Sequence, residues 1–241
     1  MSGSYGSEGI MKIIEHQGNG INYYTLVNNH HMSVTIMDWG ATVTAIKTHD
    51  KDGKFTISYT GKSDKTTLFN PSNHTYFNLS GDAERLIDHH VLKINADEYA
   101  ALNKHGIPTG KLPWVTDTPF DFRDPVEVGP QVANIKGGLH HGFVLNDTPY
   151  PQVELLDRIS GRKVTMRTNA PAVVVSSATN YRDDRYRLNG GKPMRSQLGL
   201  SLQAQKLPDA IHHKEFGSII IEPNIPVTYQ TAYRFSNIYD V

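Results

Sequence analysis

The chain has 241 residues, a formal net charge of zero and no cysteine. Balanced charge excludes the basic surface of a dedicated nucleic-acid binder, and the absence of cysteine excludes disulfides and thiolate metal sites and fits a cytoplasmic location. Its apolar runs are all far shorter than the roughly 20 residues that a membrane-spanning helix needs, so we expect no membrane partner.

Residues 1–10 are rich in glycine and serine and lack the apolar centre of a secretion signal, which predicts a flexible leader. We expect one domain over residues 11–241. The proline-rich stretch at residues 108–130 does not indicate a linker between domains, because its aromatic residues Trp114, Phe120 and Phe122 favour burial.

Short runs rich in β-branched and aromatic residues follow one another along the chain, and turn residues separate them. The last run is the clearest, since Val227, Tyr229 and Thr231 alternate with polar neighbours. Many short strands without a long amphipathic helix predict an all-β fold, an antiparallel sandwich or barrel. The predicted strands lie at residues 23–27, 32–39, 42–48, 55–59, 90–94, 153–156, 163–168, 172–177, 198–205, 218–222 and 227–235.

No sequence motif indicates a metal site, a hydrolase triad or a phosphate-binding loop. Neighbouring side chains point to opposite faces of a strand, so an adjacent histidine pair cannot chelate one ion in regular structure. Neither a Gly-x-Ser-x-Gly elbow nor a Gly-x-x-x-x-Gly-Lys loop is present. We therefore predict no metal and no cofactor. The histidine pairs are His30-His31, His89-His90, His140-His141 and His212-His213.

The run Asn70-Pro-Ser-Asn-His-Thr-Tyr-Phe-Asn-Leu-Ser-Gly-Asp82 closely resembles the signature segment of the aldose 1-epimerases (galactose mutarotases). Further matches follow in the family's order. They are Ile107-Pro-Thr-Gly110, Thr118-Pro-Phe-Asp-Phe-Arg123, Gly138-Leu-His-His-Gly-Phe-Val-Leu-Asn146, Ser160-Gly-Arg162, Leu207-Pro-Asp209 and Tyr233-Arg-Phe-Ser236.

The resemblance implies a galactose mutarotase-like supersandwich with strands missing from its N-terminal half. It also implies a partner, a hexose such as glucose or galactose, whose α and β anomers interconvert by acid/base ring opening. His141 stands at the family's general acid and His74 at a second histidine beside the ring oxygen. The alternative for both is that they satisfy buried hydrogen bonds.

Two departures from the family bear on activity. The position of the general-base glutamate holds Gln203, and a neutral amide cannot accept the anomeric proton. The segment that carries the family's active-site arginine has no counterpart between Gly40-Ala-Thr42 and Asn70. The alternative function is therefore a catalytically impaired sugar-binding relative.

Four further residues are predicted to bind the sugar: Asn73, Tyr76, His140 and Asp183. Asp184 is an alternative to Asp183, and capping of a polar loop is the competing role for either carboxylate. Core packing is the competing role for Tyr76. Missing strands would leave sheet edges exposed, which predicts a homodimer or a rearranged sheet.

Overall fold

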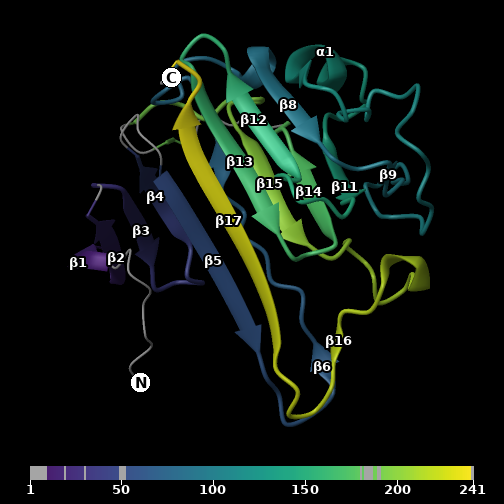
Figure 1. Cartoon of the computed structure of the whole chain (residues 1–241), viewed down its shortest axis with the longest axis horizontal. Coiled ribbons are helices and arrows are strands. Elements are labelled where there is room, and N and C mark those ends of the chain that lie inside the picture. The colour runs from purple at the N-terminus through teal and green to yellow at the C-terminus, as the bar shows by residue number, and fades with distance from the viewer. Residues whose placement is uncertain are drawn as a thin grey trace.

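The computed structural model describes residues 10–18, 20–29, 31–48, 53–179, 181, 187–188 and 191–239. Within them the protein is almost entirely antiparallel β-structure, arranged in four sheets (Figure 1). This confirms the predicted all-β fold. Residues 1–9 of the predicted leader lie outside the described residues, and the first strand begins at Ile10, the last residue of that leader.

Two sheets form the sandwich that makes up most of the molecule. The six-stranded sheet has the order β10-β8-β12-β13-β17-β5, and the five-stranded sheet has the order β7-β15-β14-β11-β9. The first comprises β10 (Val126–Glu127), β8 (His90–Ile94), β12 (Val153–Asp157), β13 (Arg162–Thr168), β17 (Val227–Asn237) and β5 (Gly53–Gly61). The second comprises β7 (Tyr76–Phe77), β15 (Leu200–Gln205), β14 (Ala172–Ser176), β11 (His140–Val144) and β9 (Glu98–Tyr99).

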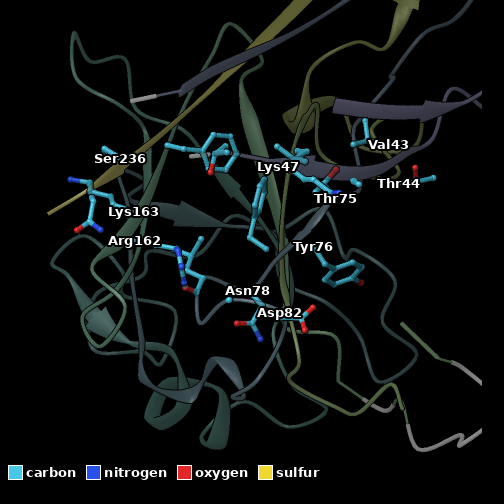
Figure 2. A pocket seen from close by; sticks show the side chains of 18 of the residues that line it. Val43, Thr44, Lys47, Thr75, Tyr76, Asn78, Asp82, Arg162, Lys163 and Ser236 are labelled. Carbon is cyan, nitrogen blue, oxygen red and sulfur yellow. The ribbon is translucent and has the colours of Figure 1, made fainter. Parts of the chain in front are cut away.

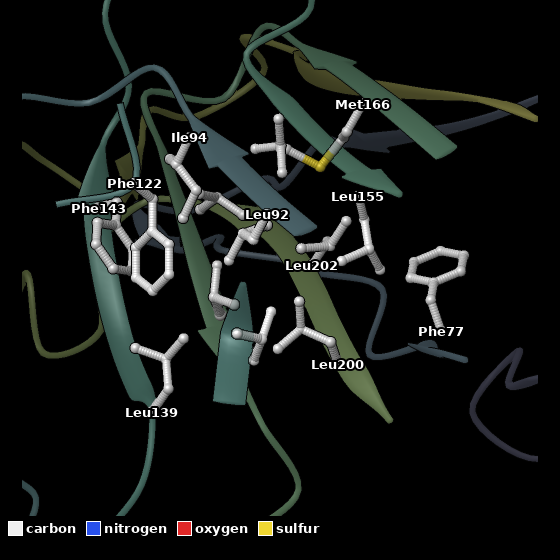
Figure 3. Packing of buried hydrophobic residues seen from close by; sticks show 14 of the residues in the cluster. Phe77, Leu92, Ile94, Phe122, Leu139, Phe143, Leu155, Met166, Leu200 and Leu202 are labelled. Carbon is white, nitrogen blue, oxygen red and sulfur yellow. The ribbon is translucent and has the colours of Figure 1, made fainter. Parts of the chain in front are cut away.

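The hydrophobic core lies between these two sheets (Figure 3). Every second residue of β15 enters it, since Leu200, Leu202 and Ala204 are buried among apolar side chains. Leu155 and Met166 meet them from the six-stranded sheet, and both are fully buried. Burial of apolar side chains at period two is what holds two antiparallel sheets face to face.

The remaining elements lie beside the sandwich. A four-stranded meander of β1 (Ile10–Gly18), β2 (Ile21–Asn28), β3 (Ser33–Met37) and β4 (Val43–Lys47) stands next to β5 (Figure 1). β16 (Ile220–Ile221) and β6 (Thr67–Leu68) form a small ribbon. The helical elements are α1 (Val128–Ala133), η1 (Ile87–His89) and η2 (Lys214–Phe216). No helix in the described part of the chain has the length and apolar character to cross a membrane.

The sequence pattern predicted most of the longer strands and missed two. The alternation along β17 is confirmed, because Thr231 and Tyr233 are buried while Thr228 and Arg234 are exposed. β1 carries two adjacent isoleucines, Ile13 and Ile14, that are both exposed, and β11 begins with a polar histidine pair, so neither strand shows a clear alternation of apolar and polar residues. One expectation about the proline-rich stretch is wrong: Phe122 is buried, but Trp114 remains 63% exposed at an isolated bridge to Glu98.

Candidate functional site

The outer face of the five-stranded sheet carries a continuous row of polar residues. Antiparallel pairing places Tyr76 opposite Ser201, Ser201 opposite Ser176, and Ser176 opposite His140. Paired residues project to the same side of a sheet, so this row crosses four strands on the face turned away from the core. The next row holds Gln203, which pairs with Val174.

A cavity of about 320 Å³ lies over this row. His74 and His140 contribute the two imidazoles that line it, and Tyr76 and Tyr181 contribute two phenols. The rings of His74 and Tyr76 are in contact, with centroids 5.1 Å apart. Ser176 and Thr179 add hydroxyl groups, which gives the cavity donors and acceptors suited to a neutral polar ligand.

The signature segment reaches this cavity because its amide side chains fasten it to the sandwich. Asn70 exchanges two hydrogen bonds with the Lys206 backbone, at 3.1 and 2.9 Å. Asn78 donates its amide to the carbonyls of Arg85 (2.7 Å) and Leu198 (2.8 Å). Asn residues at such places hold irregular backbone by replacing missing backbone partners. His74 is thus presented from a fixed loop between two anchors.

Phe77 joins the same segment to the core. Its ring packs against Tyr233 at 5.4 Å and Phe235 at 6.2 Å between centroids, while the preceding Tyr76 faces the cavity. The hydroxyl of Tyr233 donates to the carbonyl of Leu202 on β15 (2.8 Å), so the buried phenol is satisfied. Because neighbouring residues of a strand point to opposite faces, Tyr76 lines the cavity while Phe77 packs in the core.

Close backbone packing explains the glycine that precedes β11. Gly138 has φ of +83°, and a Cβ placed there would lie 2.1 Å from Thr179 Oγ1. Any side chain at position 138 would therefore be strained by the positive φ and would also come too close to Thr179. The result is that the start of β11 lies directly beside the loop that follows β14, which brings His140 close to Thr179 and Tyr181.

His140 is the imidazole that β11 contributes to the cavity. Burial lowers the pKa of His140 below its ordinary value, and the nearby His74 lowers it further. Desolvation and a like charge both oppose the protonated form. The shift favours the neutral imidazole, in which one nitrogen accepts a proton and the other donates.

His141 lies on the opposite face of β11. It pairs with the buried Val175, and its ring packs against Phe120 at 4.5 Å and Tyr99 at 6.1 Å between centroids. The backbone N–H of His140 donates to Nδ1 of His141 (3.2 Å). Burial lowers the pKa of His141 to about 4. The expected convergence of His141 with His74 is therefore not found, because strand alternation assigns the shared cavity to His140.

Gln203 lies on the outer face, as a ligand-facing role requires. It is 6% exposed, and its amide Nε2 donates to the hydroxyl of Ser201 (2.8 Å). The side chain is thus held close beside the row that ends at His140. The amide offers hydrogen bonds to a ligand but no proton-accepting group.

The other predicted binding residues have different outcomes. Asn73 is half-buried, and its Oδ1 accepts the backbone N–H of Thr75 (3.2 Å), which supports the turn before β7. Asp183, and its alternative Asp184, lie outside the described residues. Tyr181 was not singled out from the sequence, although it stands in the segment that was examined for a carboxylate. The described residues contain no group of three or more metal-ligating side chains.

Comparison with known proteins identifies the family. The family model described as aldose 1-epimerase matches residues 50–234. A maltose epimerase from Levilactobacillus brevis is 31% identical over 193 residues, which cover 77% of this chain and 54% of that protein. The human galactose mutarotase is 29% identical over 187 residues, 76% of this chain and 54% of its own length. The chain spans about half the length of these relatives.

Solved structures show the same fold. A galactose 1-epimerase from Lactobacillus acidophilus superposes with a TM-score of 0.73 at 17% identity, covering 94% of this chain and 98% of that chain. An aldose epimerase homologue from C. elegans gives 0.69 at 18% identity, covering 94% and 69%. These likenesses establish the galactose mutarotase-like β-sandwich. With the family match over residues 50–234, they show that this chain belongs to the aldose 1-epimerase family.

Proposed function

We propose that this chain binds a hexose on the outer face of the five-stranded sheet and interconverts its α and β anomers. The observation that carries the proposal is the pair of imidazoles, His74 and His140, which line one cavity. Family membership supports the reaction class, and relatives named galactose mutarotase and maltose epimerase support a sugar ligand.

The reaction needs one proton acceptor and one proton donor. One imidazole takes the proton of the C1 hydroxyl while the other protonates the ring oxygen, so the C1–O5 bond breaks and C1 becomes an aldehyde. Rotation about C1–C2 and reversal of both transfers close the ring as the other anomer. No proton is consumed, and both histidines are back in their starting states once the ring has closed.

His140 suits the accepting role in this proposal. Burial and His74 lower its pKa, so its basic nitrogen is unprotonated at pH 7. His74 lines the same cavity and donates to the ring oxygen as the imidazolium ion. The two histidines thereby supply the acceptor that the amide of Gln203 does not.

A second candidate is a sugar-binding protein with little turnover. Gln203 favours it, because an amide replaces the carboxylate that the family resemblance implies at this position. General acid–base catalysis usually contributes about 10²- to 10⁴-fold, and its loss leaves binding intact. In this case the same cavity holds the hexose without accelerating ring opening.

Polarimetry of freshly dissolved α-D-glucose or α-D-galactose tests both candidates. We expect the protein to accelerate the approach to anomeric equilibrium, and His140→Asn to reduce the rate by about 10²-fold. His141→Asn is the matched control from the adjacent position and should retain the rate. If His141 is instead the general acid, as the family resemblance implies, His141→Asn should reduce the rate and His140→Asn should retain it.

Calorimetry with the same sugars separates the two candidates. Binding without acceleration supports the binding protein, and acceleration that survives both His140→Asn and His74→Asn contradicts the imidazole pair. If no hexose binds, the proposed function fails as a whole. An unfolding curve for each variant confirms that the comparison is made on folded protein.

A further inference from the structure

The N-terminal meander ends in a long strand edge. β1 is nine residues long, pairs with β2 on one side and stands at the end of its sheet. Residues 12–17 of this strand are all exposed. The outer backbone groups of such an edge strand are a template for pairing with another chain.

The opposite edge of the meander faces the sandwich. β4 borders a cavity of about 680 Å³ that it shares with the signature segment. Figure 2 shows Val43 and Thr44 of β4 beside the same space as Tyr76 and Asn78. A second chain that approaches β4 therefore meets the sandwich, whereas β1 lies on the far side of the meander (Figure 1).

Two isoleucines make the β1 edge apolar. Ile13 is 55% exposed and Ile14 is 41% exposed, on opposite faces of the strand. Proline and clustered lysines, which commonly protect an edge strand from pairing, are both absent from β1. β5 is an edge strand of the same length, and its exposed residues are all polar. They are Lys54, Thr56, Ser58 and Thr60.

We propose that two copies of this chain pair through their β1 strands, antiparallel and about a two-fold axis at Ile14. The axis stands perpendicular to the sheet, so the two four-stranded meanders become one eight-stranded sheet. Ile14 then faces Ile14 of the second copy. On either side of the axis, Ile13 faces Glu15 of the second copy and Lys12 faces His16.

The length and the charges of β1 place the axis at this residue. Residues that face each other across two strands project to the same side of the sheet, so a two-fold axis passes through a residue and not between two residues. Ile14 is the middle residue of β1, and an axis there lets all nine residues pair. An axis at Glu15 would set two glutamates opposite each other, which is destabilising.

The extent of this pairing fits a stable interface. Hydrogen-bonded and non-hydrogen-bonded pairs alternate between antiparallel strands, and each hydrogen-bonded pair makes two bonds, so nine residues give about eight to ten bonds. A typical protein interface carries about ten. A second copy therefore satisfies the outer edge of β1 over its whole length.

Single cysteines test the position of the axis, because the chain has none of its own. Residues directly opposite each other have Cα atoms about 4.5–5.5 Å apart, which is within the reach of a disulfide. Ile14→Cys should therefore form a covalent dimer when treated with diamide, seen as a doubled mass on a non-reducing gel. Ile13→Cys is the matched control. Its Cα lies diagonally from that of its own copy at about 7–8 Å, so cross-linking should be about tenfold slower.

Sedimentation tests the association itself, and we expect the unmodified chain to be a dimer at micromolar concentration. Ile14→Lys removes both apolar side chains at the axis and sets two ammonium groups side by side, so it should raise the dimer dissociation constant about 100-fold. Ser58→Lys adds the same charge at an exposed position of β5 and should keep the dimer. Unfolding curves confirm that each variant is folded.

Several results would overturn the assignment. A monomer of the unmodified chain, or a dimer that survives Ile14→Lys, removes β1 from the interface. Cross-linking of Ile13→Cys at the rate of Ile14→Cys or faster contradicts the axis, and so does an Ile14→Cys chain that forms no covalent dimer. The outcome is independent of the proposed function, since β1 contributes none of the described residues that line the cavity of His74 and His140.

Discussion

The two faces of the five-stranded sheet are built from the same strands and have opposite characters. Toward the six-stranded sheet stand Val173, Val175 and Leu202, all fully buried in the apolar core. Toward the cavity stand Ser201 and Gln203, which hydrogen-bond to each other. Each polar residue is one position from an apolar one. Period-two alternation therefore supplies stability and chemistry together, and a one-residue displacement of a strand would exchange the two faces.

The largest expected effect belongs to the inner face. Leu202→Ala removes a fully buried side chain and should lower the free energy of unfolding by about 2–5 kcal/mol, measured by urea titration. Ser201→Ala, the neighbour on the outer face, should cost no more than about 1.5 kcal/mol, since it loses one hydrogen bond. Equal losses at the two positions would erase the distinction between the faces.

The buried His90 should make the stability of the fold depend on acid. His90 is 1% exposed, its Nε2 accepts the Leu79 N–H (2.9 Å), and burial lowers its pKa to about 4. Asp157 raises that pKa, whereas Arg85 and His89 lower it. Because the unfolded chain titrates near 6.5, it binds more protons than the native state between these values.

Stability from His90 is therefore fully present above pH 6.5 and is lost as the pH falls toward 4. The loss amounts to about 3 kcal/mol. Urea titrations at pH 7 and pH 4.5 measure it. His90→Gln keeps an acceptor for Leu79 and should flatten this dependence in part, because His141 contributes a share of its own through a pKa of about 4. An unchanged slope in His90→Gln would contradict this account.

On the outer face, a carboxylate at position 203 should raise turnover. Gln203→Glu introduces a base on the same face of the sheet as His140, and we expect the mutarotation rate to increase by about 10²-fold. Burial would raise the pKa of the new carboxyl toward neutrality, which improves it as a base. Gln205→Glu, two residues along the same face, is the control and should leave the rate unchanged. If the rate rose in both variants, the added negative charge would be the cause and its position at residue 203 would not matter.

The rate should fall at a lower pH than it would if a histidine with the usual pKa accepted the proton. The pKa of His140 lies below its usual value, so protonation of His140 should not lower the rate between pH 7.5 and 6.5 and should lower it on further acidification. Polarimetric rates across this range check the prediction on natively folded protein. A fall that begins above pH 6.5 would assign the accepting nitrogen to another group.

The smallest effect concerns association. Sequence reasoning predicted a homodimer because missing strands leave edges open, and this stays a prediction. Sedimentation at micromolar concentration should give twice the chain mass of 26.9 kDa. A monomer mass under these conditions would contradict the dimer and leave the two faces of the sheet unaffected.

The strands and the family were predictable from the sequence, and the partition of the histidines between the two faces was not. Alternation along β17 is local, so the residues themselves report it. His140 and His141 are identical residues in adjacent positions, and only the pairing of β11 with β14 decides which of them faces the cavity. Tyr181 was missed for a related reason, since its proximity to His140 depends on the close approach of Gly138 to Thr179.

The position of Phe77 has a consequence for how affinity can be altered. Because Phe77 packs on the buried Tyr233, and the residue before it, Tyr76, lines the cavity that holds His74, the shape of that cavity depends on a side chain that does not line it. A conservative change at Tyr233 should tilt β7 and shift sugar selectivity before it unfolds the chain. A search for variants with new ligand preferences can therefore begin inside the protein.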